Sequence, residues 1–205
     1  MTSNNDMLDE NRVNPDPIKQ FEEWFQTAVD ANLPLPEAMA LATVDSDGKP
    51  SARMVLLKRV DHEGFVFFTN YRSSKAEDLE TNANAALVFF WPQLEKQVRV
   101  EGTVTKTSAE ESREYFASRP RGSQIGAWAS PQSQVIPTRE VLEKRQAELE
   151  ELYRDREVDW PEHWGGFCLR PDRIEFWKGR SDRLHDRILY EREGDSSWSI
   201  KRLAP

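Results

Sequence analysis

The pattern of apolar residues predicts one N-terminal helix and, after it, a series of short strands. From Pro17 onward, apolar side chains recur every three or four residues, which is typical of a helix with one buried face. Asp16 directly precedes Pro17, and Asp is a common capping residue before a first helical turn that begins with Pro. The helix is therefore predicted to begin at Pro17 and to span about 15 residues.

After this helix the apolar period shortens to two residues, which is typical of strands. The segments predicted to be strands are 38–44, 51–60, 65–69, 85–91, 97–105, 166–177, 185–191 and 198–203. Residues 85–91 are apolar throughout, so this strand is predicted to be buried on both faces, whereas 97–105 alternates between polar and apolar positions. The strand at 166–177 is predicted to be interrupted near Pro171.

Three further helices are predicted between the strands. Ser74 and Ser108 are each followed three residues later by Glu, a capping-box pattern that predicts a helix start. Residues 138–154 have helical spacing, and the Pro-, Gly- and Ser-rich segment 119–137 before them is predicted to be a long loop. Because strands and helices do not alternate, the pattern favours an α+β fold with an antiparallel, barrel-like sheet and peripheral helices.

Length and hydropathy indicate a single domain. Residues 1–15 are polar and without period, so we expect a flexible N-terminal arm followed by one domain at 16–205. The longest apolar run has seven residues, far fewer than the roughly 20 that a membrane helix needs. No secretory signal is recognisable, and we expect a cytoplasmic protein that does not associate with membranes.

Charge and cysteine content narrow the function classes. The net charge of −8 argues against a nucleic-acid partner. The single cysteine, Cys168, excludes an intrachain disulfide and is predicted to be a core residue because both its neighbours are apolar. The three histidines and this cysteine lack the spacing of a metal site, and neither a glycine-rich phosphate loop nor a nucleophile elbow is present. Cations nevertheless gather in short clusters, which suit small anionic ligands.

Two of these clusters have a spacing that suggests chemistry. In an extended strand, Arg183, His185 and Arg187 would share one face and could bind an anion and handle a proton; a mixed-charge surface strand is the alternative. Tyr115 and Arg119 share one face of a predicted helix, which indicates either a phosphate cradle, completed by a serine in the following loop, or helix-end capping.

Two other positions complete the candidate anion sites. Ser74 and Lys75 lie at a predicted helix N-terminus, where free backbone N–H groups attract anions. Arg53 and Lys58 would face opposite sides of a regular strand, roughly 16 Å apart. They could contact one ligand only through a bulge or from opposite ends of an extended molecule.

Five segments stand in an order and spacing that support a family resemblance. They are Arg53-Met54-Val55-Leu56-Leu57-Lys58, Phe67-Phe68-Thr69-Asn70, residues 118–128, Glu175-Phe176-Trp177 and Arg183-Leu184-His185-Asp186-Arg187. Together with the chain end at 198–205, they resemble the pyridoxine (pyridoxamine) 5′-phosphate oxidases. The resemblance extends from about residue 16 to the last residue.

The resemblance implies a split β-barrel homodimer with FMN sites at the interface, each built from both chains. It implies oxidation of pyridoxine 5′-phosphate and pyridoxamine 5′-phosphate to pyridoxal 5′-phosphate, with oxygen as electron acceptor and hydrogen peroxide as the second product. The positions that it implies for FMN are Arg53, Met54, Val55, Leu56, Leu57, Lys58, Phe68, Thr69, Ser74, Lys75, Gln97, Gln132, Ser133, Trp177 and Arg187. Those implied for the substrate are Lys58, Tyr115, Arg119, Ser123, Arg183, Leu184 and His185, with Arg183 and His185 as catalytic residues over the pyridine ring.

Two departures from the family pattern qualify these expectations. Family members often carry an Arg-x-Glu-Tyr segment near the N-terminus that closes over the substrate, but here the arm contains only Arg12 and no Tyr, so no such lid is expected. Ser74 stands where the family commonly has Arg, which predicts weaker retention of FMN unless Arg72 compensates.

Two other functions are compatible with the same motifs. One is the related flavin oxidase of phenazine-type biosynthesis, which should not need a cradle for a vitamin phosphate. The other is a non-catalytic FMN-binding split barrel, which would bind the flavin without turnover.

Overall fold

A computed structural model describes residues 7–194 and 197–205 of the chain. Within this part of the chain, nine antiparallel strands form one sheet. They are β1 (Ala38–Val44), β2 (Pro50–Leu56), β3 (Arg59–Asp61), β4 (Gly64–Asn70), β5 (Asn84–Trp91), β6 (Lys96–Lys106), β7 (Trp164–Lys178), β8 (Asp186–Glu193) and β9 (Ser197–Leu203). The helices are α1 (Pro17–Asp30), α2 (Ser74–Thr81), α3 (Ala109–Ser118), α4 (Arg121–Ala129) and α5 (Glu140–Leu152), with short 3₁₀ turns η2 (Pro92–Leu94) and η3 (Ser181–Arg183).

The sheet curls so that its two edges are joined by consecutive residues. Its strand order is β2-β1-β5-β6-β7-β4-β3, with β8 and β9 extending from β7. Leu57 N–H donates to Glu37 O next to β1, whereas Lys58 N–H donates to Val66 O on β4. The prediction of one strand at 51–60 was therefore wrong, because the chain changes partners between β2 and β3. The predicted α+β class with an antiparallel split barrel is confirmed.

Helix α1 fills the concave side of this sheet. It begins at Pro17 as predicted, and Asp16 caps it by accepting a hydrogen bond from Ile18 N–H. Phe21 is fully buried, with its ring 4.9 Å from that of Phe65 and 4.8 Å from that of Phe89. This face of α1 therefore belongs to the main core.

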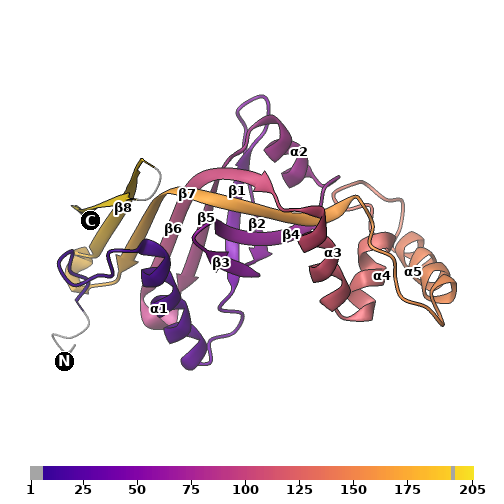
Figure 1. The fold of residues 1–205 in the computed structure, drawn as a ribbon, viewed down its shortest axis with the longest axis horizontal. Coiled ribbons are helices and arrows are strands. Elements are labelled where there is room, and N and C mark those ends of the chain that lie inside the picture. Colours follow the sequence, from indigo (N-terminus) through magenta and orange to yellow (C-terminus); the bar gives the residue numbers. More distant parts are fainter. Residues whose placement is uncertain (1–6, 195–196) are drawn as a thin grey trace.

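A second, smaller core lies under α3, α4 and α5, which gather at one end of the molecule (Figure 1). Ile125 and Ala129 of α4 are buried beside Leu149 of α5 and Tyr153. The prediction of a loop at 119–137 was wrong here, since α4 occupies its middle. The helix predicted at 138–154 is confirmed as α5, slightly shortened at both ends.

Three local predictions need correction. Strand β5 is not buried on both faces, because Phe90 is 56% exposed. Helix α2 is capped at Ser73 rather than Ser74, and the Ser73 side chain does not bond the helix amides. Strand β7 is not broken at Pro171, but it is irregular there as predicted: Glu101 of β6 pairs with Arg173 and Gly102 with Pro171, so Asp172 is an extra residue on β7. A Cβ on Gly102 would lie 2.0 Å from Arg170 O, so only glycine fits there.

Residues 7–15 belong to the segment predicted to be flexible, yet they are fastened to the barrel. Leu8 is buried, and Arg202 of β9 donates to Leu8 O and pairs with Glu10. The Tyr190 hydroxyl on β8 donates to Asn14 O at 2.8 Å. The rest of the predicted arm, residues 1–6, lies outside the described residues.

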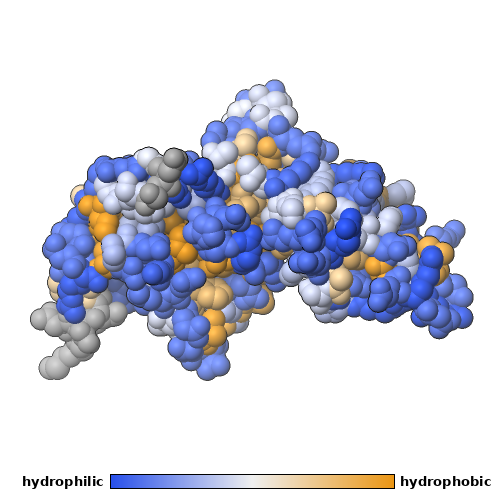
Figure 2. All heavy atoms as spheres, in the orientation of Figure 1, coloured by the Kyte–Doolittle hydropathy of each residue, from blue (hydrophilic) through white to orange (hydrophobic). Residues whose placement is uncertain are grey.

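Hydrophilic residues cover most of the face shown in Figure 2, with apolar residues in separate small areas. The exposed large apolar side chains include Leu35, Met54 and Phe90, which line a groove of about 550 Å³ over β1, β2 and β5. In the parts of the chain described, no helix combines the length and apolar character needed to cross a membrane.

Candidate functional site

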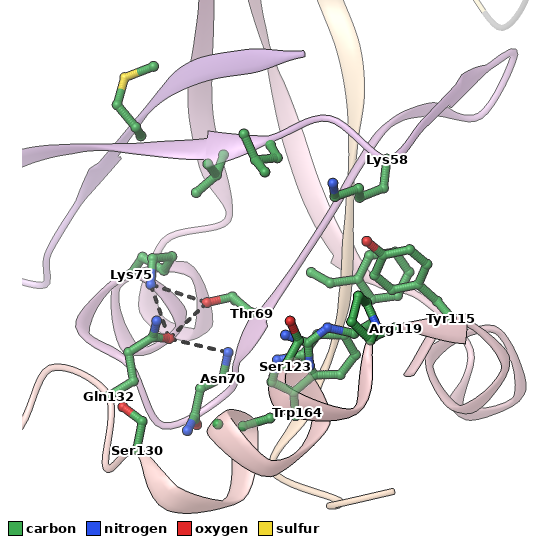
Figure 3. Close-up of a pocket in the computed structure, with 17 residues that line it drawn as sticks. Lys58, Thr69, Asn70, Lys75, Tyr115, Arg119, Ser123, Ser130, Gln132 and Trp164 are labelled. Carbon is green, nitrogen blue, oxygen red and sulfur yellow. Dashed lines mark hydrogen bonds between the residues drawn. The ribbon is translucent and has the colours of Figure 1, made fainter. Parts of the chain in front are cut away.

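A cavity of about 580 Å³ opens between the barrel and the helices α2, α3 and α4. Figure 3 shows its lining, in which polar side chains form two groups on separate sides. One group surrounds Lys75 and Gln132, and the other contains Tyr115, Arg119 and Ser123. The expected site residues that line the cavity are Met54, Val55, Leu56, Lys58, Phe68, Thr69, Lys75, Tyr115, Arg119, Ser123 and Gln132.

Lys75 is a buried ammonium surrounded by neutral oxygens. Its Nζ donates to Thr69 Oγ1 and to Ser73 Oγ, each at 3.1 Å, and lies 3.5 Å from Gln132 Oε1. Among the described residues, no carboxylate forms an ion pair with it. Burial and, to a smaller extent, the charge of Arg53 lower the pKa of Lys75. A buried cation without a counter-ion is costly, so this end of the cavity is suited to an anion.

The N-terminus of α2 adds to the same end. Ser73, its capping residue, uses its hydroxyl to donate to Asn70 O and to accept from Lys75, and it leaves the helix amides without a side-chain cap. Free amides at a helix start and the helix dipole both favour a negative group. The backbone therefore supports the anion preference of Lys75.

Arg119 is the second cation of the cavity, and its side chain is half-buried. In residues 7–194 and 197–205, its Nη1 is the one buried side-chain nitrogen or oxygen without a hydrogen-bond partner. Burial lowers its pKa, and its guanidinium lies 4.4 Å from the centre of the Trp164 ring. Ser123 and Tyr115 line the cavity beside it, and Lys58 reaches in from the opposite wall (Figure 3). Such a set of donors matches a phosphate group.

Stacked aromatic rings form the wall between these donors. The rings of Phe68 and Tyr115 are 4.0 Å apart and nearly parallel, and Trp164 stacks on both. The wall could pack against a flat ligand ring.

A second set of expected residues lies elsewhere on the same chain. Gln97, Trp177 and Arg187 are register neighbours across β6, β7 and β8. The ring of His185 lies 4.6 Å from that of Trp177. None of these four residues lines the cavity. Arg187 instead donates two hydrogen bonds to the carboxylate of the buried Glu175. These bonds raise the pKa of Arg187.

The prediction that Arg183, His185 and Arg187 share a strand face was wrong. Arg183 lies in η3, where it and Asp182 have φ values of 61° and 58°, and β8 begins only after His185. Two consecutive left-handed residues are uncommon outside glycine and mark a constrained turn. Arg183 is exposed, and Leu184 is 70% exposed.

The imidazole of His185 is held in one tautomer by this turn. Its Nδ1 accepts a hydrogen bond from Arg180 N–H at 3.1 Å. A backbone amide can only donate, so Nδ1 carries no proton and Nε2 carries it. The turn therefore presents His185 as a neutral hydrogen-bond donor.

Four further expected residues do not line the cavity. Leu57 is buried in the core, whereas Ser74 and Ser133 are exposed. Arg53 is directed to Thr43, Ser51 and Asp78. Arg72, the possible substitute for the missing family arginine, is exposed and is not part of the lining.

Sequence reasoning assigned no site role to several lining residues. They are Asn70, Pro120, Gly126 and Ala127, which lie within the quoted motifs, and Ser130 and Trp164, which lie outside them. A signal existed for Trp164, because this aromatic residue directly precedes the Gly165-Gly166 pair at the start of a strand. The glycines are needed because a Cβ on Gly165 would lie 2.2 Å from the Tyr71 hydroxyl oxygen.

The described residues contain no cluster of three or more His, Cys, Asp or Glu side chains placed to bind a metal ion. Cys168 is buried, as expected, and burial raises the pKa of its thiol. Its environment is that of a structural cysteine.

Two family models match the chain. A model described as pyridoxamine 5′-phosphate oxidase matches residues 25–153, and a model of the pyridoxine 5′-phosphate oxidase C-terminal dimerisation region matches residues 164–205. The chain belongs to the pyridoxamine 5′-phosphate oxidase family. Two relatives named pyridoxine/pyridoxamine 5′-phosphate oxidase are similar over nearly the whole chain. The one from Paraburkholderia phymatum is 57% identical, and the match covers 97% of this chain and 93% of the relative. The one from a Cyanothece species is 55% identical, and the match covers 97% of this chain and 92% of the relative.

Two solved structures have the same fold as this chain. PhzG from Burkholderia lata, in complex with tetrahydrophenazine-1-carboxylic acid, superposes with a TM-score of 0.91 at 31% identity over 98% of each chain. A pyridoxamine 5′-phosphate oxidase-related, FMN-binding protein from Nostoc punctiforme has a TM-score of 0.74 at 17% identity, covering 93% of this chain and 98% of its own. The second likeness concerns the fold alone.

Proposed function

We propose that the protein is an FMN-dependent oxidase that converts pyridoxine 5′-phosphate and pyridoxamine 5′-phosphate to pyridoxal 5′-phosphate, with oxygen as electron acceptor and hydrogen peroxide as by-product; from the amine, water releases the nitrogen as ammonia. Residues 16–205 would act as one catalytic domain. The observation that supports this most strongly is a cavity lined by two cations, the buried Lys75 and the half-buried Arg119, neither of which forms an ion pair among the described residues. FMN and the substrate each carry one phosphate, so the reaction needs two such places.

The residues at the Lys75 end fit FMN. The Nζ of Lys75 and the uncapped amides of α2 would hold its phosphate, and Thr69 and Gln132 fix the position of the ammonium. Met54, Val55 and Leu56 line the same cavity and would contact the flavin. When bound, FMN would supply the hydride acceptor that no protein side chain offers.

The Arg119 end fits the phosphate of the vitamer. Arg119, with its unpartnered Nη1, would donate to the phosphate together with Ser123, Tyr115 and Lys58. Fixing that phosphate orients the pyridine ring, and orientation is the main contribution that a protein makes to hydride transfer. Arg183 and His185 would lie over the pyridine ring, where the protonated Nε2 of His185 can donate a hydrogen bond to a ring substituent.

A homodimer is the assembly that this proposal requires. The family region that describes dimerisation covers residues 164–205, which contain Trp177, His185 and Arg187. These residues do not line the cavity of their own chain, so a partner copy would supply them. The exposed apolar groove with Leu35 and Phe90 adjoins the cavity through Met54, which lines both. An apolar surface continuous with the site is suited to burial against a second copy.

The proposed activity is tested by reconstituting the apoprotein with FMN in air. Pyridoxine 5′-phosphate, pyridoxamine 5′-phosphate and unphosphorylated pyridoxine are then supplied separately, and pyridoxal 5′-phosphate and peroxide are measured together. We expect equal amounts of both products from the two phosphorylated compounds and little oxidation of pyridoxine. Bound FMN without turnover would contradict the proposal and favour a non-catalytic FMN-binding barrel.

A phenazine-type flavin oxidase is the second candidate, and the likeness to PhzG supports it. The same reconstituted protein separates the two functions. Oxidation of a reduced phenazine carboxylic acid, without oxidation of the phosphorylated vitamers, would favour the second candidate. We rank it lower because a phenazine substrate offers no phosphate for the unpartnered Nη1 of Arg119.

A further inference from the structure

Arg53 lies next to the Lys75 end of the cavity, but its guanidinium is engaged by other groups. Its Nη1 donates to Thr43 Oγ1 at 2.6 Å, and its Nη2 donates to Ser51 Oγ at 2.7 Å. The same Nη2 is 3.5 Å from Asp78 Oδ2. The side chain of the next residue, Met54, lines the cavity, whereas Arg53 does not.

Asp78 brings a negative charge to the helix face that carries Lys75. The two residues are three apart on α2, so they lie on the same side of the helix. The Asp78 side chain is only 13% exposed, and its Oδ2 accepts a hydrogen bond from Thr43 Oγ1 at 2.5 Å. Arg53 is close enough to Lys75 for its charge to lower the lysine pKa. Two cations and one carboxylate thus meet at the place assigned to the cofactor phosphate.

We propose that Asp78 is an internal counter-ion that competes with the phosphate of FMN for Arg53 and so lowers the affinity of this chain for FMN. The inference rests on the proposed function, because it takes the Lys75 end as the FMN phosphate site. Asp78 is not needed to orient Arg53, since Thr43 and Ser51 hold the guanidinium by shorter contacts. Its main effect is therefore electrostatic: it partly neutralises Arg53 and repels an incoming dianion.

The variant Asp78→Asn tests this directly. Asn keeps an oxygen that can accept from Thr43 and removes only the charge. Titrating the apoprotein with FMN, followed by flavin fluorescence, should show binding about three- to tenfold tighter than in the unaltered protein. Affinity for riboflavin, which lacks the phosphate, should stay unchanged. The matched control is Glu77→Gln, which removes one exposed charge from the same helix and should change affinity less than about twofold.

A double variant shows whether Asp78 acts through Arg53. In an Arg53→Gln background, Asp78→Asn should no longer tighten FMN binding appreciably. Unchanged or weaker FMN binding by Asp78→Asn alone, equal tightening of riboflavin, or the same gain without Arg53 would each overturn the inference. These outcomes would leave the proposed function intact, provided that the unaltered protein oxidises the phosphorylated vitamers. If the unaltered apoprotein binds no FMN, both are overturned.

Discussion

Arg119 is expected to destabilise the ligand-free protein and to bind the phosphate of the substrate. A half-buried guanidinium whose Nη1 is buried without a hydrogen-bond partner destabilises the fold unless a ligand pairs with it. We predict that Arg119→Met raises KM for pyridoxine 5′-phosphate about tenfold or more while leaving the melting temperature of the apoprotein unchanged or higher.

Steady-state kinetics and a thermal melt on the same preparation check both halves of this prediction. Arg113→Met is the control, since Arg113 lies on α3, which ends directly before Arg119, but contacts Trp160 outside the cavity. An unchanged KM, or a melting temperature lowered by more than about 4 °C, would count against the assigned role of Arg119.

Lys75 should make FMN binding depend on pH. Burial lowers its pKa, so it loses its proton at a lower pH than an exposed lysine does. A bound phosphate favours the protonated form and raises that pKa, so affinity should be greatest below the lowered pKa and fall as the pH rises through it.

Fluorescence titrations from about pH 7 to about pH 9.5 measure this dependence. In Lys75→Met, FMN binding at neutral pH should be weaker and nearly independent of pH over this range. An affinity of the unaltered protein that stays constant across the range would refute the assignment of Lys75 to the phosphate.

At the residue scale, the sequence predicted which side chains would lie near one another better than it predicted their conformations. Tyr115 and Arg119 both line the cavity, as their four-residue spacing suggested, although Arg119 is the extended C-cap residue after α3 rather than part of the helix. Arg183 and His185 were not placed correctly, because alternation in the sequence does not reveal two left-handed residues in a 3₁₀ turn. The bonds of Arg53 to Thr43 and Asp78 join distant segments, and no local pattern encodes them.

Helix α4 was predicted to be part of a loop because of its residue types. Its sequence contains Gly122, Ser123 and Gly126 after Pro120, all of which are common in loops. It is helical because Ile125 and Ala129 are buried against α5, a tertiary contact that overrides weak propensity. By contrast, Ser108 caps α3 by accepting from Glu111 N–H as predicted, since a capping box is a local signal.

A pair of glycine substitutions tests helix α4 and the close contact between β6 and β7. Gly122→Ala should stabilise the protein by a few tenths to about 1 kcal/mol, because a Cβ there meets no atom within 4 Å and alanine favours the helix. Gly102→Ala should destabilise it by about 2 kcal/mol or more, because its Cβ would overlap Arg170 O. Urea unfolding curves give both values. A loss of stability in Gly122→Ala would show that α4 is not a regular helix at this position.

At the scale of the whole molecule, closure of the sheet explains the position of the cavity. The chain changes partner between β2 and β3, and as a result residues 54–56 of β2 and Lys58, just before β3, line one cavity, whereas Arg53 does not. The sequence left this open because hydrophobic alternation gives strands but not their partners. The second set of site residues, on β6 to β8, remains away from the cavity in the single chain.

Mixing two inactive variants tests most directly the claim that oxidation needs one half-site from each chain. Arg119→Ala disables the cavity half, and Arg187→Ala disables the other half. If each site uses both chains, a mixed dimer contains one intact site and one doubly altered site, so random re-association should restore about a quarter of the unaltered rate of pyridoxal 5′-phosphate formation. If each site lies within one chain, every site in the mixture carries one substitution, and the rate should stay at the level of the separate variants. The second result would contradict the proposed shared active site.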